Sequence, residues 1–162
     1  LLKGLIFNEG IVLEPEGFNK NILLIHGHQA DFYNYVWWKW SRFLVRVLWK
    51  PLQVVGIKDP TSPAKNFKEL IKVERRLKKW ILANNNQMVI AGHTHRPRFP
   101  EPNELPYFND GSCVHPRSIT GIEIVDLKIS LIKWHIISKK DGTLQIVKSV
   151  LEEPRDIALY LK

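Results

Sequence analysis

Two short apolar runs of this chain each lead into a pair of histidines separated by one residue. Residues 22–25 precede His26-Gly-His28, and residues 88–91 precede Gly92-His-Thr-His95. Continuous apolar runs rich in β-branched residues are typical of strands buried on both faces, which occur in α/β sheets. The carboxyl ends of such strands are where α/β sheets place their ligand sites. We therefore expect an α/β fold with four imidazoles at strand ends.

The spacing within each histidine pair indicates a metal site. Residues two apart in extended chain point to the same side, so each pair presents two imidazoles together. Gly27 and Gly92 lack a Cβ and let the backbone approach a ligand closely. One isolated histidine is more typical of a hydrogen-bonded structural residue, which is our expectation for His115 and His135. Two pairs with neighbouring glycines favour metal binding instead.

Three segments of the chain resemble, in the same order, the later motifs of calcineurin-like metallophosphoesterases. They are residues 22–31 (Ile-Leu-Leu-Ile-His-Gly-His-Gln-Ala-Asp), 91–97 (Ala-Gly-His-Thr-His-Arg-Pro) and 107–112 (Tyr-Phe-Asn-Asp-Gly-Ser). The resemblance extends over about residues 20–137. It implies the C-terminal part of a four-layer sandwich in which two mixed sheets are flanked by helices. It also implies metal-dependent hydrolysis of a phosphate ester through a dinuclear metal site.

The resemblance also implies roles for individual residues. His26 and His93 would bind one metal ion, and His95 would bind the second. The site would hold two divalent ions, with manganese, iron or zinc suited to imidazole ligands. Further residues are implied at the substrate side of the site, where Arg96 could contact a phosphate oxygen, and in a structural turn beneath it. The substrate-side residues are His28, Asp31 and Arg96, and the turn residues are Asn109, Gly111 and Ser112.

The motifs that open the family pattern do not occur in this sequence. These are Asp-x-His, Gly-Asp-x-x-Asp and Gly-Asn-His followed by an acidic residue. Because the sequence also starts at Leu1 without Met, we expect one domain over 1–162 that is an N-terminally truncated fragment. The full-length parent would be the phosphoesterase, and the fragment alone would be inactive. Exposed strand edges would then favour a homo-oligomer or association with the missing N-terminal half.

Two other functions remain open from the sequence. One is a non-catalytic module in which His26, His93 and His95 surround a single zinc ion. The other is a membrane-surface module using an aromatic and basic helical insertion at 32–50, which carries four tryptophans. The structural alternative for this segment is a helix that packs on the sheets and covers their apolar surface. The basic stripe of this segment comprises Lys39, Arg42, Arg46 and Lys50.

Charge indicates the class of binding partner, and cysteine content indicates the cellular compartment. There are 24 basic and 16 acidic residues, a net charge of +8, which favours anionic partners such as a phosphate-ester substrate. A lone cysteine, Cys113, forms no intramolecular disulfide, so we expect a cytoplasmic protein that can be peripheral to the membrane. The basic residues of a predicted helix over 63–83 are more typical of a solvated face than of a nucleic-acid site, and no nucleic-acid partner is expected.

Periodicity and turn residues predict the remaining elements. Residues 5–14 suggest a small hairpin around Asn8-Glu-Gly10, and four prolines between 97 and 106 indicate a loop. The predicted helix has an apolar face and ends at the three asparagines 84–86. That apolar face comprises Phe67, Leu70, Ile71, Leu77 and Ile81. The C-terminal third is predicted to be an antiparallel sheet formed from residues 107–108, 121–125, 129–136 and 144–147.

Overall fold

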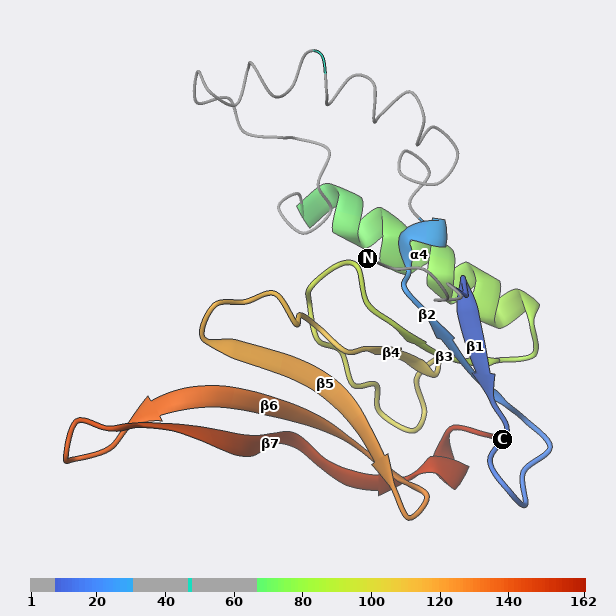
Figure 1. Cartoon of the computed structure of the whole chain (residues 1–162). Helices are drawn as coiled ribbons and strands as arrows, with labels where there is room; N and C mark the ends of the chain where they lie inside the picture. Colours follow the sequence, from blue (N-terminus) through green and yellow to red (C-terminus); the bar gives the residue numbers. More distant parts are fainter. Residues whose placement is uncertain (1–7, 31–46, 48–66) are drawn as a thin grey trace.

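The computed structural model describes residues 8–30, 47 and 67–162. These residues form two β-sheets and one long helix, so the predicted α/β fold is confirmed (Figure 1). Residues 32–46 and 48–50, which make up nearly all of the predicted aromatic insertion, lie outside the described residues, as does Asp31. The elements are β1 (Gly10–Leu13), β2 (Ile22–Ile25), η1 (His28–Ala30), α4 (Phe67–Ala83), β3 (Met88–Ala91), β4 (Tyr107–Asn109), β5 (Ser118–Val125), β6 (Lys128–Ser138), β7 (Leu144–Asp156) and η3 (Ile157–Leu159).

The first sheet has the order β1-β2-β3-β4. Strand β1 is antiparallel to β2, whereas β2, β3 and β4 are mutually parallel, so this sheet is mixed as expected. The hairpin predicted over 5–14 takes a different form, because Gly10–Leu13 pairs with β2, while residues 5–7 lie outside the described ranges. Tyr107 and Phe108 were predicted to belong to the antiparallel sheet, and that prediction is wrong. Tyr107–Asn109 forms β4, parallel to β3.

The second sheet is an antiparallel meander, β5-β6-β7. Its strands are longer than the predicted ones, since β7 runs through Pro154 to Asp156. The resemblance implied a second mixed sheet with a helical layer over it. In the part of the chain that the structure describes, this sheet is purely antiparallel and α4 lies against the other sheet. The described layers are therefore helix, sheet and sheet.

Alternation along β3 explains why three layers form. Met88 and Ile90 pack into the cluster between the two sheets, whereas Val89 and Ala91 pack into the cluster under α4. Side chains of a strand point alternately to opposite faces, so a strand with every residue apolar can be covered on both sides. In the cluster between the sheets, Phe108 is fully buried and makes edge-to-face contacts with Phe99 and Tyr160, with ring centroids 5.1 and 4.9 Å apart.

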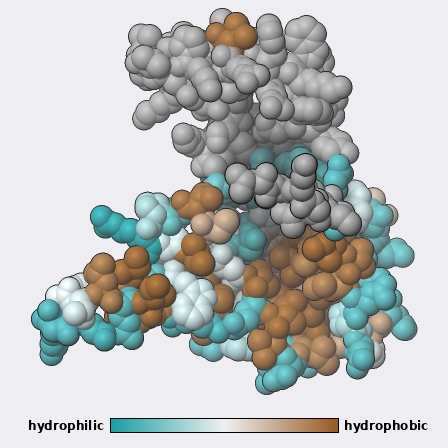
Figure 2. All heavy atoms as spheres, in the orientation of Figure 1, coloured by the Kyte–Doolittle hydropathy of each residue, from teal (hydrophilic) through white to brown (hydrophobic). Residues whose placement is uncertain are grey.

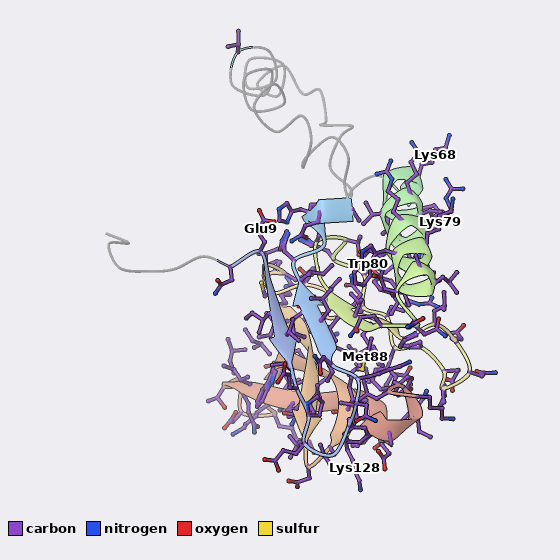
Figure 3. All side chains as sticks on the ribbon, turned by 90° about the vertical axis from the view of Figure 1, so that its right-hand side faces the viewer. Glu9, Lys68, Lys79, Trp80, Met88 and Lys128 are labelled. Carbon is purple, nitrogen blue, oxygen red and sulfur yellow. The ribbon has the colours of Figure 1, made fainter. Side chains whose placement is uncertain are left out.

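Helix α4 ends where the sequence predicts, and its covered face differs in part from the predicted one. Asn85 and Asn86 adopt positive φ of 52° and 54° directly after the helix, as asparagines do with little strain. Leu70, Leu77 and Ile81 are buried as predicted, together with Val73, which the prediction omitted. Phe67 and Ile71 are exposed instead, because they lie to one side of the stripe that faces the sheet. Basic residues such as Lys68 and Lys79 project away from the sheet (Figure 3).

Candidate metal centre

The two His-x-His pairs leave the first sheet side by side. Strands β2 and β3 are parallel neighbours in register, with Ile25 opposite Ala91, so both end at the same edge of the sheet. The loops that follow are tied together, because the Gly92 N–H donates to the His26 carbonyl oxygen at 3.1 Å. The two histidine pairs therefore lie at the same edge of the first sheet.

The imidazole of His26 contacts two of the other three. The rings of His26 and His93 are edge to face with centroids 5.1 Å apart, and those of His26 and His28 are 5.2 Å apart. The Nδ1 atoms of His26 and His28 are separated by 3.2 Å. Without a metal, that distance is a hydrogen bond in which one ring donates and the other accepts. It also matches the roughly 3.3 Å between two nitrogens bound to one tetrahedral zinc at about 2.05 Å each.

Left-handed backbone lets the chain turn sharply at this edge. Gly27 has a φ of +100°, and a Cβ there would lie 3.1 Å from the Gly92 carbonyl oxygen. His93 and His95 also have positive φ, 68° and 56°. Non-glycine residues adopt this conformation only at a cost of roughly 1–3 kcal/mol each, which the surrounding structure must offset. Two of the three candidate ligands, His93 and His95, therefore stand on strained backbone.

A buried asparagine holds the strained loop. Asn109 is 1% exposed, and its Nδ2 lies 3.0 Å from the Gly92 carbonyl oxygen, 3.1 Å from Thr94 Oγ1 and 3.2 Å from the Tyr107 hydroxyl. Because Gly92 and Thr94 flank His93, the amide holds the Gly92 backbone on one side of that ligand candidate and the Thr94 side chain on the other. Burial raises the pKa of Tyr107, so its phenol stays protonated at neutral pH. The hydrogen bonds of Asn109 therefore orient the histidine loop from behind the candidate ligand.

The same asparagine begins the tight turn predicted at 109–112. Its Oδ1 accepts a hydrogen bond from the Gly111 N–H at 3.0 Å, and Gly111 has a φ of +84°. A Cβ at Gly111 would overlap the Thr120 hydroxyl oxygen. That hydroxyl oxygen accepts from the Ser112 N–H at 3.0 Å. The turn thus links β4 of the first sheet to β5 of the second, beneath the histidine loop.

Electrostatics at the site favour neutral imidazole. Partial burial lowers the pKa of His26, and nearby His93, His28 and His95 lower it further. A neutral imidazole keeps the nitrogen lone pair that a metal needs. Desolvation raises the pKa of Asp110, opposed by its own backbone hydrogen bond and by His95. His95 therefore lies within electrostatic range of both His26 and Asp110.

The remaining predicted residues are placed differently. The Arg96 guanidinium lies over the Phe67 ring, 5.8 Å from its centroid, toward the start of α4. Among the described residues, no group of three or more His, Cys, Asp or Glu side chains is arranged to hold a metal ion as it stands. His115 is exposed in a loop, and His135 lies on β6, away from these strand ends.

Sequence reasoning missed the residues that hold the first histidine loop. Gln29 Oε1 accepts from the Gly27 N–H at 3.0 Å, while its Nε2 donates to the Glu9 carbonyl oxygen at 2.7 Å. Arg76 of α4 donates to the Ala30 carbonyl oxygen at 2.8 Å, which ties η1 to the helix. The contact between Gln29 and Gly27 is local, because the two residues are two positions apart in sequence. The contact between Arg76 and Ala30 joins residues 46 positions apart, and no local sequence pattern indicates it.

A groove of about 770 Å³ opens beside the histidines. Its polar end includes Glu9, His26, His28 and Asp110, and its walls are apolar side chains from both sheets. This volume lies within the roughly 300–1,000 Å³ typical of ligand sites. The apolar wall residues include Leu13, Leu24, Ile90, Ile122 and Ile124.

Solved structures of Vps29, proteins of the calcineurin-like metallophosphoesterase fold, match this chain. Wild-type Vps29 from Entamoeba histolytica complexed with Zn²⁺ is 19% identical with a TM-score of 0.41, and the match covers 93% of this chain and 63% of that one. Vps29 from Chaetomium thermophilum is 10% identical with a TM-score of 0.42, covering 91% and 60%. Vacuolar protein sorting 29 from Cryptosporidium parvum is 20% identical with a TM-score of 0.37, covering 91% and 59%.

This chain thus spans about six-tenths of the length of the Vps29 chains that it matches. No protein-family model matches the sequence, and no curated protein matches it either. With TM-scores near 0.4, the function proposed below rests on the residues of the site.

Proposed function

We propose that this chain supplies the histidine ligands of a divalent-metal site that hydrolyses phosphate esters. The observation that carries the proposal is the convergence of two His-x-His loops at the ends of adjacent parallel strands, with the His26 and His93 rings 5.1 Å apart. His26 and His95 are exposed, so a metal ion has access to their imidazole nitrogens. A metal ion accepts several nitrogen lone pairs at once.

In this proposal His26 and His93 hold one ion and His95 contributes to a second. His28 is close enough to His26 to join the first ion, since their Nδ1 atoms are 3.2 Å apart. Imidazole ligands suit manganese, iron or zinc. When bound, such ions lower the pKa of a coordinated water and neutralise phosphate charge. The residues of this chain orient the ligands, through Asn109 for His93 and through Gln29 for the loop after His26.

The proposal assigns the remaining ligands to a polypeptide segment that carries Asp-x-His, Gly-Asp-x-x-Asp and Gly-Asn-His motifs, which residues 1–162 lack. We therefore expect little or no hydrolysis by this chain alone and phosphoesterase activity in a protein that joins both parts. Its substrate would occupy the polar end of the groove beside His26 and His28.

A second candidate function is a non-catalytic zinc module. It is favoured by the contacts of the His26 ring with the rings of His28 and His93, at 5.2 and 5.1 Å between centroids, which bring three imidazoles near one another. In this alternative one ion closes the site, with His95 as a further ligand.

Titration calorimetry of the chain with Zn²⁺ and Mn²⁺ tests the proposal. Replacing His26 or His93 by alanine should lower the affinity for the first ion at least tenfold, because one ligand is removed. The matched variant His115→Ala should leave this affinity unchanged. Equal affinity of H26A and H115A would refute the metal site.

Hydrolysis of an aryl phosphate with Mn²⁺ separates the two functions. Two ions per chain with weak residual turnover supports the phosphoesterase half-site, whereas one tightly held ion with no turnover supports the zinc module. Turnover at rates typical of an enzyme by residues 1–162 alone would refute the expectation that other ligands are required.

A further inference from the structure

One face of the second sheet carries apolar side chains where a soluble sheet normally carries polar ones. Directly paired residues of an antiparallel sheet point to the same side. Trp134 pairs with Ile119, and Ile136 two residues further along β6 pairs with Ile146. Because alternate residues of one strand share a face, these four side chains lie together on one side of the sheet.

That side faces away from the first sheet. Ile129 of β6 and Ile122 and Ile124 of β5 pack into the core between the sheets. Ile129 is an odd number of residues from Trp134, and β6 and β5 pair without interruption over this stretch. The apolar set therefore points outward, and the sheet has apolar residues on both faces.

The set is large and close to the free end of the β6–β7 hairpin. Leu144 and Ile146 are 72% and 67% exposed, and the other members are all more than two-fifths exposed. Figure 2 shows hydrophobic atoms along this projecting hairpin and hydrophilic atoms at its tip. Isolated exposed apolar residues are normal, but a contiguous group marks an interaction surface. We call this group the outer apolar face: Ile119, Trp134, Ile136, Leu144, Ile146 and Val150.

Cations surround the outer apolar face. Lys139 and Lys140 are exposed in the tip turn, and Arg117 is exposed directly before β5. The one acid of the tip turn, Asp141, is engaged locally by the backbone N–H and the hydroxyl of Thr143, at 2.9 and 2.7 Å.

One acid on the same side of the sheet is already paired. Glu123 lies on the same side of the sheet as Trp134 and forms an ion pair with Lys148 at 2.6 Å. The rim at the hairpin end of the face, formed by Lys139, Lys140 and Arg117, is therefore positive. A second copy of a chain with net charge +8 would bring like charges together, so charge favours an anionic partner over self-association.

We propose that the outer apolar face docks this chain onto an anionic lipid bilayer. Leu144, Ile146 and Ile136 enter the boundary between headgroups and acyl chains, while Lys139 and Lys140 contact lipid phosphates. The amphipathic ring of Trp134 suits this interface, where one side is apolar and the other hydrated. The proposal concerns residues 117–150 alone and is independent of the metal site. No helix in the described part of the chain is long and apolar enough to span a membrane.

Flotation of the chain with vesicles tests the proposal. We expect binding to phosphatidylcholine vesicles that contain 30% phosphatidylserine, and weak binding to phosphatidylcholine alone. The double variant Leu144→Ser/Ile146→Ser should bind at least about tenfold more weakly, because two of the most exposed apolar side chains are removed. Lys139→Glu/Lys140→Glu should lose the dependence on phosphatidylserine. The matched control is Leu82→Ser/Val114→Ser, which removes side chains of similar exposure, 61% and 69%, from other surfaces and should bind like the parent chain.

A fluorophore attached at a single cysteine shows which surface of the chain enters the bilayer. With Cys113 replaced by serine, an environment-sensitive fluorophore on Ile146→Cys should shift to the blue with anionic vesicles, and one on Leu82→Cys should not. Vesicle binding that is unchanged by L144S/I146S would overturn the proposal. So would a dimer in solution that this double variant dissociates, because the face would then be a protein interface.

Discussion

Replacing Asn109 by alanine should destabilise the fold and loosen the histidine loop together. The side chain is 1% exposed, its Oδ1 accepts one hydrogen bond, and its Nδ2 has two protons to share among three oxygens at 3.0 to 3.2 Å. At most three hydrogen bonds are therefore lost. At a net value of about 1 kcal/mol each, the free energy of unfolding should fall by about 3 kcal/mol.

Urea unfolding followed by tryptophan fluorescence measures this loss. Asn103→Ala, at an exposed position of the loop before β4, is the matched control and should change stability by no more than about 0.5 kcal/mol. Asn109→Asp keeps the shape and the acceptor for Gly111 but removes the donor, so it should cost at least as much as alanine. Zn²⁺ affinity of N109A at a temperature where it is folded should fall about tenfold or more, as expected for a residue that orients a ligand. A loss of stability equal to that of N103A would show that the Asn109 hydrogen bonds do not stabilise the fold.

Two further substitutions test the turn beneath the site and the core. Gly111→Ala should lower the free energy of unfolding by about 2–4 kcal/mol, because the new Cβ would overlap the Thr120 hydroxyl at a φ of +84°. Gly142 has the same φ with open space around it, so Gly142→Ala should lower the free energy of unfolding by about 1 kcal/mol. Thermal unfolding of both variants checks this, and equal costs would contradict the overlap. Phe108→Ala should lose about 3–5 kcal/mol in urea unfolding, and a loss below about 1 kcal/mol would contradict its place at the centre of the core.

Local pattern was enough to predict the elements that form the site. Strands β2 and β3 follow from apolar runs, and their histidines meet because parallel strands end at one edge of a sheet. The end of α4 follows from three asparagines that tolerate left-handed backbone. The two strands and the end of the helix depend on neighbours in sequence, which is why the sequence predicts them, whereas the adjacency of β2 and β3 depends on pairing between distant segments.

Features that depend on distant partners were not predicted. Tyr107–Asn109 has the same apolar character as an antiparallel strand, and only its pairing with β3 shows that it belongs to the parallel sheet. The proximity of Arg96 to Phe67 also follows from tertiary packing, which brings the start of α4 beside the histidine loop. Likewise, the outward direction of Trp134 depends on which side of β6 the first sheet covers.

The most direct test of the metal site is anomalous diffraction from crystals of the chain soaked in ZnCl₂, with data collected at the zinc absorption edge. We expect a strong anomalous peak at about 2.0–2.1 Å from a nitrogen of His26 and a nitrogen of His93. No peak at the ends of β2 and β3, or a peak only at His115 or Cys113, would contradict this expectation.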